Sequence, residues 1–353
     1  MGFRLLRIYC GITIRFFFKK CQVNNVEAVP DTGPVIFIPN HQNAFLDAVL
    51  VVVKTKRNPW SIARASAFKK QFMARLLAII RVKPVFRFRD GMTSLRGNDA
   101  IFKEWTEMLE RGEDITIFAE GNHNEPYAAG TLQKGFARMA LQYQQANDQP
   151  VAIVPVGLHY EDHHSFRSRV LVNFGNPINV KDIAHAQINE REKLDMVVAL
   201  TDRELKARCL AIPPDEMYPH KIAYLLNNRQ HKDDMLEQLA ADRKVLEEYP
   251  LTAGAPKKKM PAILRYGNPV VWIGYLLHFL PYTLFKVIIK KVAKEQQFVG
   301  SLKYAMGTFL LPPYYILLLV ILYLVVPNMA LVLGTGLALP FLGTATVDWL
   351  KRT

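Results

Sequence analysis

One segment of this 353-residue chain, Ala305–Val347, contains no ionisable side chain other than tyrosine. Because about 20 apolar residues cross the hydrocarbon core of a bilayer, the segment is long enough for two membrane-spanning helices. We therefore predict a transmembrane hairpin at about 309–326 and 329–347, with Pro327-Asn328 between the two helices. The alternative is a pair of helices buried in a soluble core.

Basic residues flank this predicted hairpin at both ends. They are Lys290, Lys291, Lys294 and Lys303 before it, and Lys351 and Arg352 after it. Because basic flanks stay on the cytoplasmic side of a membrane, both ends of the hairpin are predicted to be cytoplasmic. A third apolar segment, 269–289, also has basic residues on both sides. Its flanks favour a re-entrant or interfacial segment, within a membrane region that covers 263–353.

The pattern of residues 1–25 predicts an amphipathic helix at the membrane interface. One side of a helical wheel carries Arg4, Arg7, Arg15 and Lys19. The remaining side carries Leu5, Ile8, Ile12 and Phe16. A basic stripe beside an apolar face is typical of a helix that lies among lipid headgroups. Arginines interrupt the apolar positions and no small-residue cleavage site follows, which argues against a cleaved signal peptide.

Residues 26–212 alternate between strand-like and helix-like patterns. Apolar runs of strand length occur at Val35–Ile38, Trp60–Ala63, Lys83–Phe86, Asp114–Phe118, Val151–Leu158 and Val170–Phe174. Helical patterns occur at about 44–54, 66–80, 98–110, 134–146 and 187–208. This alternation predicts an α/β domain with a mixed, largely parallel sheet flanked by helices. A polar connector follows at 213–262, with a solvated helix expected at roughly 229–248.

Composition narrows the class of protein. Half of the residues are hydrophobic, which excludes an intrinsically disordered chain. The three cysteines fit neither a disulfide framework nor a metal-binding spacing, so free thiols in a reducing compartment are predicted. Lys and Arg exceed Asp and Glu by 45 to 31, an excess that attracts phosphate groups. No nucleic-acid-binding motif accompanies this charge, so no nucleic-acid partner is expected.

A histidine lies at the junction of a predicted strand and a predicted helix. Pro39 ends the strand because proline cannot donate to a sheet ladder, and Asn40 and His41 follow it. Asp47 comes six residues after His41, a spacing that puts the two side chains on different faces of a regular helix. They can meet if His41 sits in the turn before the helix, where a histidine oriented by a carboxylate makes a general base. The alternative is a histidine that caps the turn, with Asp47 at the surface.

Two other short motifs also follow predicted strands. Glu120-Gly121 places a carboxylate beside a glycine at a strand's carboxyl end, a common position for a ligand site, although a plain turn is the alternative. Arg87 and Arg89 alternate along a strand end, so both guanidinium groups can face one phosphate. A solvated basic edge is the alternative for the arginines.

The order and spacing of these motifs resemble those of the glycerolipid acyltransferase family, which includes 1-acyl-glycerol-3-phosphate and glycerol-3-phosphate O-acyltransferases. The matching positions are Asn40, His41 and Asp47; Arg87 with its neighbour Arg89; Phe118, Glu120 and Gly121; Lys134-Gly135; and Val154-Pro155. The resemblance covers roughly residues 30–180. Four blocks in the same order are far more specific than any one of them.

This resemblance implies a membrane-bound O-acyltransferase of phospholipid biosynthesis with its catalytic domain on the cytoplasmic face. In such an enzyme, His41 is the general base and Asp47 orients it. The donor is acyl-CoA or an acyl carrier protein thioester, and the acceptor is 1-acyl-glycerol-3-phosphate or glycerol-3-phosphate. The implied substrate-binding residues are Asn40, Arg87, Arg89, Glu120, Gly121, Asn122 and Lys134. Membrane lipids are the implied partners, and neither a metal nor a cofactor is implied.

The sequence departs from the family pattern at two places. Five residues rather than four separate His41 from Asp47. In the third block, Ala119 replaces a proline and Asn122-His123 replaces Thr-Arg, which removes an arginine associated with the acceptor's phosphate. Another lyso-lipid acceptor, such as an aminolipid, therefore stays open. So does a non-catalytic lipid-binding protein with a degenerate site.

Overall fold

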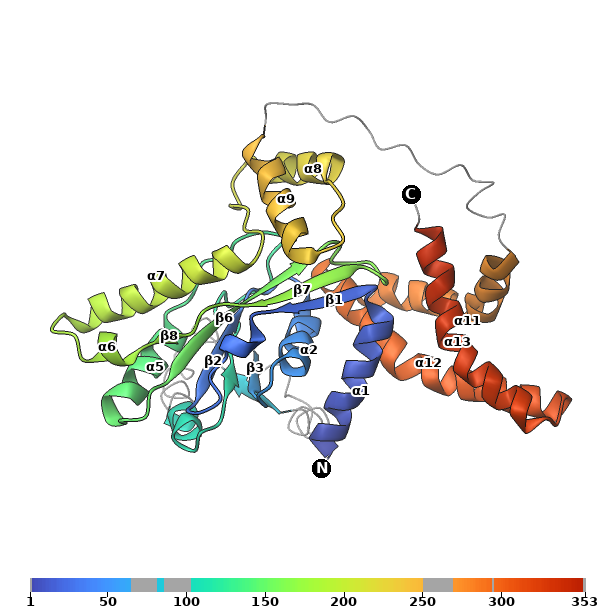
Figure 1. Ribbon diagram of the computed structural model, residues 1–353, viewed down its shortest axis with the longest axis horizontal. Helices are drawn as coiled ribbons and strands as arrows, with labels where there is room; N and C mark the ends of the chain where they lie inside the picture. The colour runs from blue at the N-terminus through green and yellow to red at the C-terminus, as the bar shows by residue number, and fades with distance from the viewer. Residues whose placement is uncertain (1, 65–80, 86–102, 250–268, 294, 352–353) are drawn as a thin grey trace. The chain divides into compact units, whose positions relative to one another are not determined.

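The computed structural model describes residues 2–64, 81–85, 103–249, 269–293 and 295–351 (Figure 1). Its chain divides into two compact units. The first contains Met1–Tyr9, Gln22–His159 and Leu171–Tyr218, and the second contains Cys10–Cys21, Tyr160–Val170 and Pro219–Thr353. Of the predicted helices, 66–80 lies outside the described residues, and the described part of 98–110 is helical from residue 103.

An eight-stranded sheet forms the centre of the α/β part of the described chain. Its strands are β1 (Lys20–Asn24), β2 (Val35–Pro39), β3 (Trp60–Arg64), β4 (Val82–Val85), β5 (Ile115–Thr116), β6 (Ala152–Tyr160), β7 (Arg169–Phe174) and β8 (Ile178–Asn179). They are ordered β1-β7-β6-β2-β5-β3-β4, with β8 antiparallel to β6. Strand β2 is parallel to both β5 and β6, and β3 is parallel to both β4 and β5. The predicted mixed, largely parallel sheet is confirmed.

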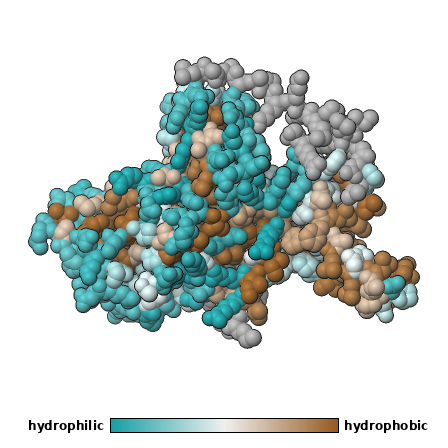
Figure 2. Space-filling model, in the orientation of Figure 1, coloured by the Kyte–Doolittle hydropathy of each residue, from teal (hydrophilic) through white to brown (hydrophobic). Residues whose placement is uncertain are grey.

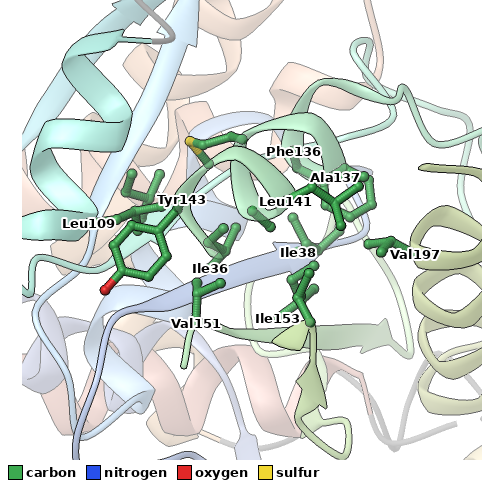
Figure 3. Close-up of a cluster of buried hydrophobic side chains, with 14 of the residues drawn as sticks. Ile36, Ile38, Leu109, Phe136, Ala137, Leu141, Tyr143, Val151, Ile153 and Val197 are labelled. Atoms are coloured by element: carbon green, nitrogen blue, oxygen red, sulfur yellow. The ribbon is translucent and has the colours of Figure 1, made fainter. Parts of the chain in front are cut away.

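Helices pack against this sheet and enclose its core. They include α2 (Ala44–Lys54), α5 (Gly135–Ala146), α6 (Lys181–Ala184) and α7 (Glu190–Arg208), besides the short 3-10 helix Val26–Ala28. Strand β2 is buried along its whole length, as expected of a central parallel strand. Its Ile36 and Ile38 lie in one cluster with side chains of α5 and α7, such as Phe136 and Val197 (Figure 3). This packing fixes β2 as the rigid strand from which the site residues extend.

The N-terminal helix α1 (Gly2–Phe17) is shorter than the predicted 1–25 segment. Residues 20–24 belong to the sheet instead, so the α/β domain begins before residue 26. Arg7 does not point away from the protein, because its guanidinium donates to the carbonyls of Thr55 and Arg57 and to Asn58. Arg4 and Arg15 are exposed. The apolar side chains of Leu5, Ile8 and Ile12 are also exposed, at 60%, 62% and 49%.

Three long helices lie in the second unit, α11 (Pro269–Val292), α12 (Gln297–Val325) and α13 (Met329–Leu350). Each is long and apolar enough to cross a membrane, by length and composition. The break at 326–328 agrees with the predicted Pro327-Asn328 hinge. Helix α11 runs without interruption through Pro281, and the re-entrant or interfacial placement of 269–289 stays a prediction. Figure 2 shows hydrophobic residues over α12 and α13 on the visible face.

The polar connector is more ordered and more buried than predicted. It contains α8 (Tyr218–Asn228) and α9 (Met235–Glu247) rather than one helix at 229–248. Helix α9 is not a solvated helix, because Met235, Leu239 and the carboxylate of Asp242 are buried. The sequence pattern did not indicate this buried face. Asp242 is charged but buried in an ion pair with Arg229, and in the sequence such a residue looks like an exposed one.

Candidate active site

The site begins where β2 ends. Asn40 follows the strand, and its side-chain amide donates to the carbonyl of Leu158 at 3.0 Å and accepts the backbone N–H of Leu158 at 2.6 Å. Both bonds join the end of β2 to the neighbouring β6. These two bonds hold the turn that contains His41. The Asn40 amide is therefore engaged within the protein, whereas the family resemblance implied that Asn40 binds substrate.

His41 and Asp47 meet as predicted. His41 Nδ1 lies 3.0 Å from Asp47 Oδ2, and the carboxylate is fully buried. The contact forms because α2 begins only at Ala44, which leaves His41 in the turn and Asp47 in the first helical turn. Asp47 Oδ2 also accepts the backbone N–H groups of Gln42 at 2.9 Å and Asn43 at 2.8 Å. A carboxylate on Nδ1 favours the tautomer in which Nε2 accepts a proton.

Two rings pack against the His41 imidazole. Phe118 stacks on it with ring centroids 3.9 Å apart and an interplanar angle of 24°. His123 lies with its ring centroid 4.0 Å away, tilted by 54°. The His41 side chain is 13% exposed, so the ring is confined yet reachable from outside. Sequence reasoning did not select His123 as a site residue, although it lies two residues after Gly121.

Glu120 contacts the backbone of the histidine. Its Oε2 accepts the N–H of His41 at 3.0 Å and the side-chain amide of Asn124. Burial raises the pKa of Glu120 to about 7, with a smaller contribution from the negative charge of Asp47, while hydrogen bonds from His41, Asn124 and Gly130 oppose the rise. A carboxylate 9% exposed is therefore placed directly beside the candidate base.

The other predicted site residues lie in different situations. Arg87 and Arg89 fall outside the described residues. Gly121 adopts φ +73°, a left-handed turn that favours glycine, and Asn122 follows it at an exposed position. The Lys134 ammonium pairs with Asp195 on α7, where both side chains are about half exposed. Within the described part of the chain, no group of three or more potential metal ligands is assembled.

Part of the chain is similar to known acyltransferases. A family model described as Acyltransferase matches residues 20–159, a range that includes every site residue discussed above. Glycerol-3-phosphate O-acyltransferase 1 of Saccharomyces cerevisiae is 37% identical over 98 residues, which are 27% of this chain and 13% of that protein. Residues 20–159 therefore contain an acyltransferase domain. The match begins at β1, in agreement with the structural start of the domain.

Other known proteins match further parts of this chain. An uncharacterized acyltransferase of Schizosaccharomyces pombe is 20% identical over 255 residues, which are 48% of this chain and 38% of that protein. The chain thus covers less than two fifths of the length of either of these curated relatives. Among solved structures, the 1-acyl-sn-glycerophosphate acyltransferase PlsC of Thermotoga maritima is 19% identical and covers 58% of this chain and 80% of its own, with a TM-score of 0.41.

Glu120 makes the stability of the protein depend on pH. Because its pKa is raised from 4.5 to about 7 in the fold, the fold favours the protonated form. Its contribution to stability is fully present below pH 4.5 and is lost as the pH rises through about 7. We expect the Glu120→Gln variant to gain stability relative to wild type by up to about 3 kcal/mol between pH 4.5 and pH 8. Thermal unfolding of both proteins in detergent measures this, and a difference that does not change with pH would contradict it.

Proposed function

We propose that this acyltransferase is a membrane-bound enzyme of phospholipid biosynthesis. It transfers a fatty acyl group from acyl-CoA or an acyl carrier protein thioester to the hydroxyl of glycerol-3-phosphate or 1-acyl-glycerol-3-phosphate. The observation that carries the proposal is the 3.0 Å contact between His41 Nδ1 and the buried Asp47 carboxylate at the carboxyl end of β2. The matched yeast relative is named a glycerol-3-phosphate O-acyltransferase, which supports this acceptor class.

The proposed chemistry is direct transfer. His41 Nε2 removes the proton of the acceptor hydroxyl while the hydroxyl oxygen attacks the thioester carbonyl. The new C–O bond forms, the C–S bond breaks, and the leaving thiolate takes the proton back from the imidazolium. Asp47 stabilises the imidazolium through Nδ1. The reaction needs neither a metal nor an organic cofactor.

The acceptor is bound in this proposal by Arg87, Arg89, Lys134, Gly121 and Asn122. Arg87 and Arg89 hold its phosphate, since paired guanidinium groups suit a phosphate's geometry. Lys134 adds a third cation when it exchanges Asp195 for the phosphate. Gly121 and Asn122 contact the acceptor through the turn that they form, in which Gly121 has a positive φ and Asn122 is exposed.

The membrane setting fits an acyl donor and a lipid product. Helices α11, α12 and α13 supply long apolar segments, and α1 exposes Leu5, Ile8 and Ile12 toward what we propose is the lipid interface. Basic residues at both ends of α12–α13 favour a catalytic domain on the cytoplasmic face, with membrane lipids as partners and no nucleic-acid partner.

An acceptor panel tests the proposal. Detergent-solubilised protein is given palmitoyl-CoA or an acyl carrier protein thioester with glycerol-3-phosphate, 1-acyl-glycerol-3-phosphate, lysophospholipids or a lyso-aminolipid. Thiol release and the acylated product are measured. We expect release that requires glycerol-3-phosphate or its 1-acyl form.

Each other outcome has a distinct meaning. Thiol release only with a lyso-aminolipid would mean that the acceptor is an aminolipid. The sequence leaves this acceptor open because Asn122-His123 replaces the Thr-Arg pair of the family pattern. No release with any donor, in folded protein that binds lipid vesicles, would support a lipid-binding protein without this activity.

A further inference from the structure

Glu120 is committed to the protein's own backbone. We propose that Glu120 and Asn124 are positioning residues that hold the backbone of His41, and that Glu120 does not contact the acceptor. The role in catalysis rests on the function proposed above. It differs from the one that family resemblance implies for Glu120, which is binding of the acceptor's glycerol portion.

The Glu120–Asn124 pair holds both polar groups of the His41 backbone. The N–H of His41 donates to Glu120 Oε2 at 3.0 Å. The carbonyl of His41 accepts the backbone N–H of Asn124 at 2.8 Å, and the Asn124 side chain donates to the same Glu120 oxygen. The two residues and His41 therefore close a ring of hydrogen bonds. Asp47 fixes the side chain of His41, and this ring fixes its main chain.

Further contacts tie the loop that contains Asn124 to the same place. The Gln42 side-chain amide donates to the carbonyl of Ala128 at 3.0 Å. The backbone N–H of Gln133 donates to the carbonyl of Ala119 at 2.7 Å. Contacts within the protein therefore hold this loop next to the turn that contains His41.

Gly130 packs closely against the Glu120 side chain. The backbone N–H of Gly130 donates to the Glu120 carboxylate. A Cβ at Gly130 would collide with the Asn124 amide and lie 2.9 Å from the Glu120 carboxyl carbon. The Glu120 carboxylate thus accepts hydrogen bonds from His41, Asn124 and Gly130, and the residue is only 9% exposed. Little of it is left to accept a hydrogen bond from a substrate hydroxyl. When Glu120 is ionised, above its pKa of about 7, these hydrogen bonds are charge-assisted and roughly twice as strong as neutral ones, which suits a role in fixing geometry.

Two variants and a control test the proposal. Glu120→Gln keeps the shape and weakens the acceptor oxygen, and Gly130→Ala disturbs the pair from the opposite side. Glu125→Gln removes an exposed carboxylate from the same loop and is the control. We expect kcat to fall ~10- to 100-fold in the first two variants, because small displacements of a base cost this much. The KM for the acceptor should stay within about twofold.

A second measurement requires no turnover. Carbethoxylation of His41 by diethyl pyrocarbonate at pH 8, mapped by peptide mass spectrometry, is followed without donor or acceptor. We expect several-fold faster labelling of His41 in Glu120→Gln and Gly130→Ala, because a released turn exposes the ring more, and an unchanged rate in Glu125→Gln. If Gly130→Ala does not fold, Glu120→Gln alone decides.

Two results would overturn the positioning role. One is a tenfold or larger rise in acceptor KM at unchanged kcat in Glu120→Gln, which indicates acceptor binding. The other is wild-type labelling of His41 in every folded variant. If wild-type protein transfers no acyl group to any acceptor, the proposed function fails, and the labelling still decides whether the pair holds His41.

Discussion

Replacement of His41 by alanine is expected to lower acyl transfer by ~10²–10⁴-fold, because a positioned general base contributes about this much. The ring is the group that can take the hydroxyl proton, with Nδ1 engaged by Asp47 at 3.0 Å. Alanine removes the ring and leaves the backbone contacts with Glu120 and Asn124 in place. Vesicle binding should be unchanged, since the membrane helices contain no part of this pair. Thiol release at saturating donor and acceptor measures the loss.

Asp47→Asn separates orientation from proton transfer within the same pair. The asparagine keeps one acceptor oxygen for the backbone N–H groups of Gln42 and Asn43, but it cannot stabilise an imidazolium. We therefore expect a comparable loss of kcat with little change in acceptor KM. His185→Ala, at an exposed histidine after α6, is the matched control and should retain wild-type activity. Near-wild-type activity of His41→Ala would exclude the proposed mechanism.

Local patterns predicted the centre of the site. Pro39 marks the end of β2, and α2 begins at Ala44, so the position of His41 in the intervening turn follows from strand and helix signals alone. The Asp47 contact was conditional on that turn, and the structure confirms it. Helix α2 spans 44–54 as predicted, because its apolar periodicity and its burial agree.

Contacts between distant segments were not accessible in the same way. Lys134 forms an ion pair with Asp195, 61 residues away in the sequence, and no local sequence pattern links these two residues. The pairing of Glu120 with the His41 backbone spans 79 residues. Strand β1 follows α1 closely and enters the sheet beside β7, a placement that its half-polar sequence does not indicate. Spacing within the chain identifies which residues matter, whereas tertiary packing decides which atoms each one contacts.

Loss of the buried ion pair between Arg229 and Asp242 of α9 is expected to lower the free energy of unfolding strongly. Arg229 donates to both carboxylate oxygens of Asp242, at 2.9 and 2.7 Å, and the two side chains are 8% and 0% exposed. Gln238 donates to Asp242 at 2.8 Å and accepts from Arg169 at 3.1 Å. Asp242→Ala leaves a buried guanidinium without its carboxylate, so we expect a loss of about 3–5 kcal/mol in unfolding free energy.

The exposed pair Asp202–Lys206 on α7 provides the matched control, with side chains 30% and 46% exposed. Asp202→Ala should change unfolding free energy by less than about 0.5 kcal/mol, because solvent screens such a pair. Denaturant unfolding in detergent, followed by tryptophan fluorescence, compares the two variants. Adding Arg229→Met to Asp242→Ala should recover part of the loss, since the unpaired buried charge is then removed. Equal effects of Asp242→Ala and Asp202→Ala would mean that water reaches the Arg229–Asp242 pair and that α9 is solvated after all.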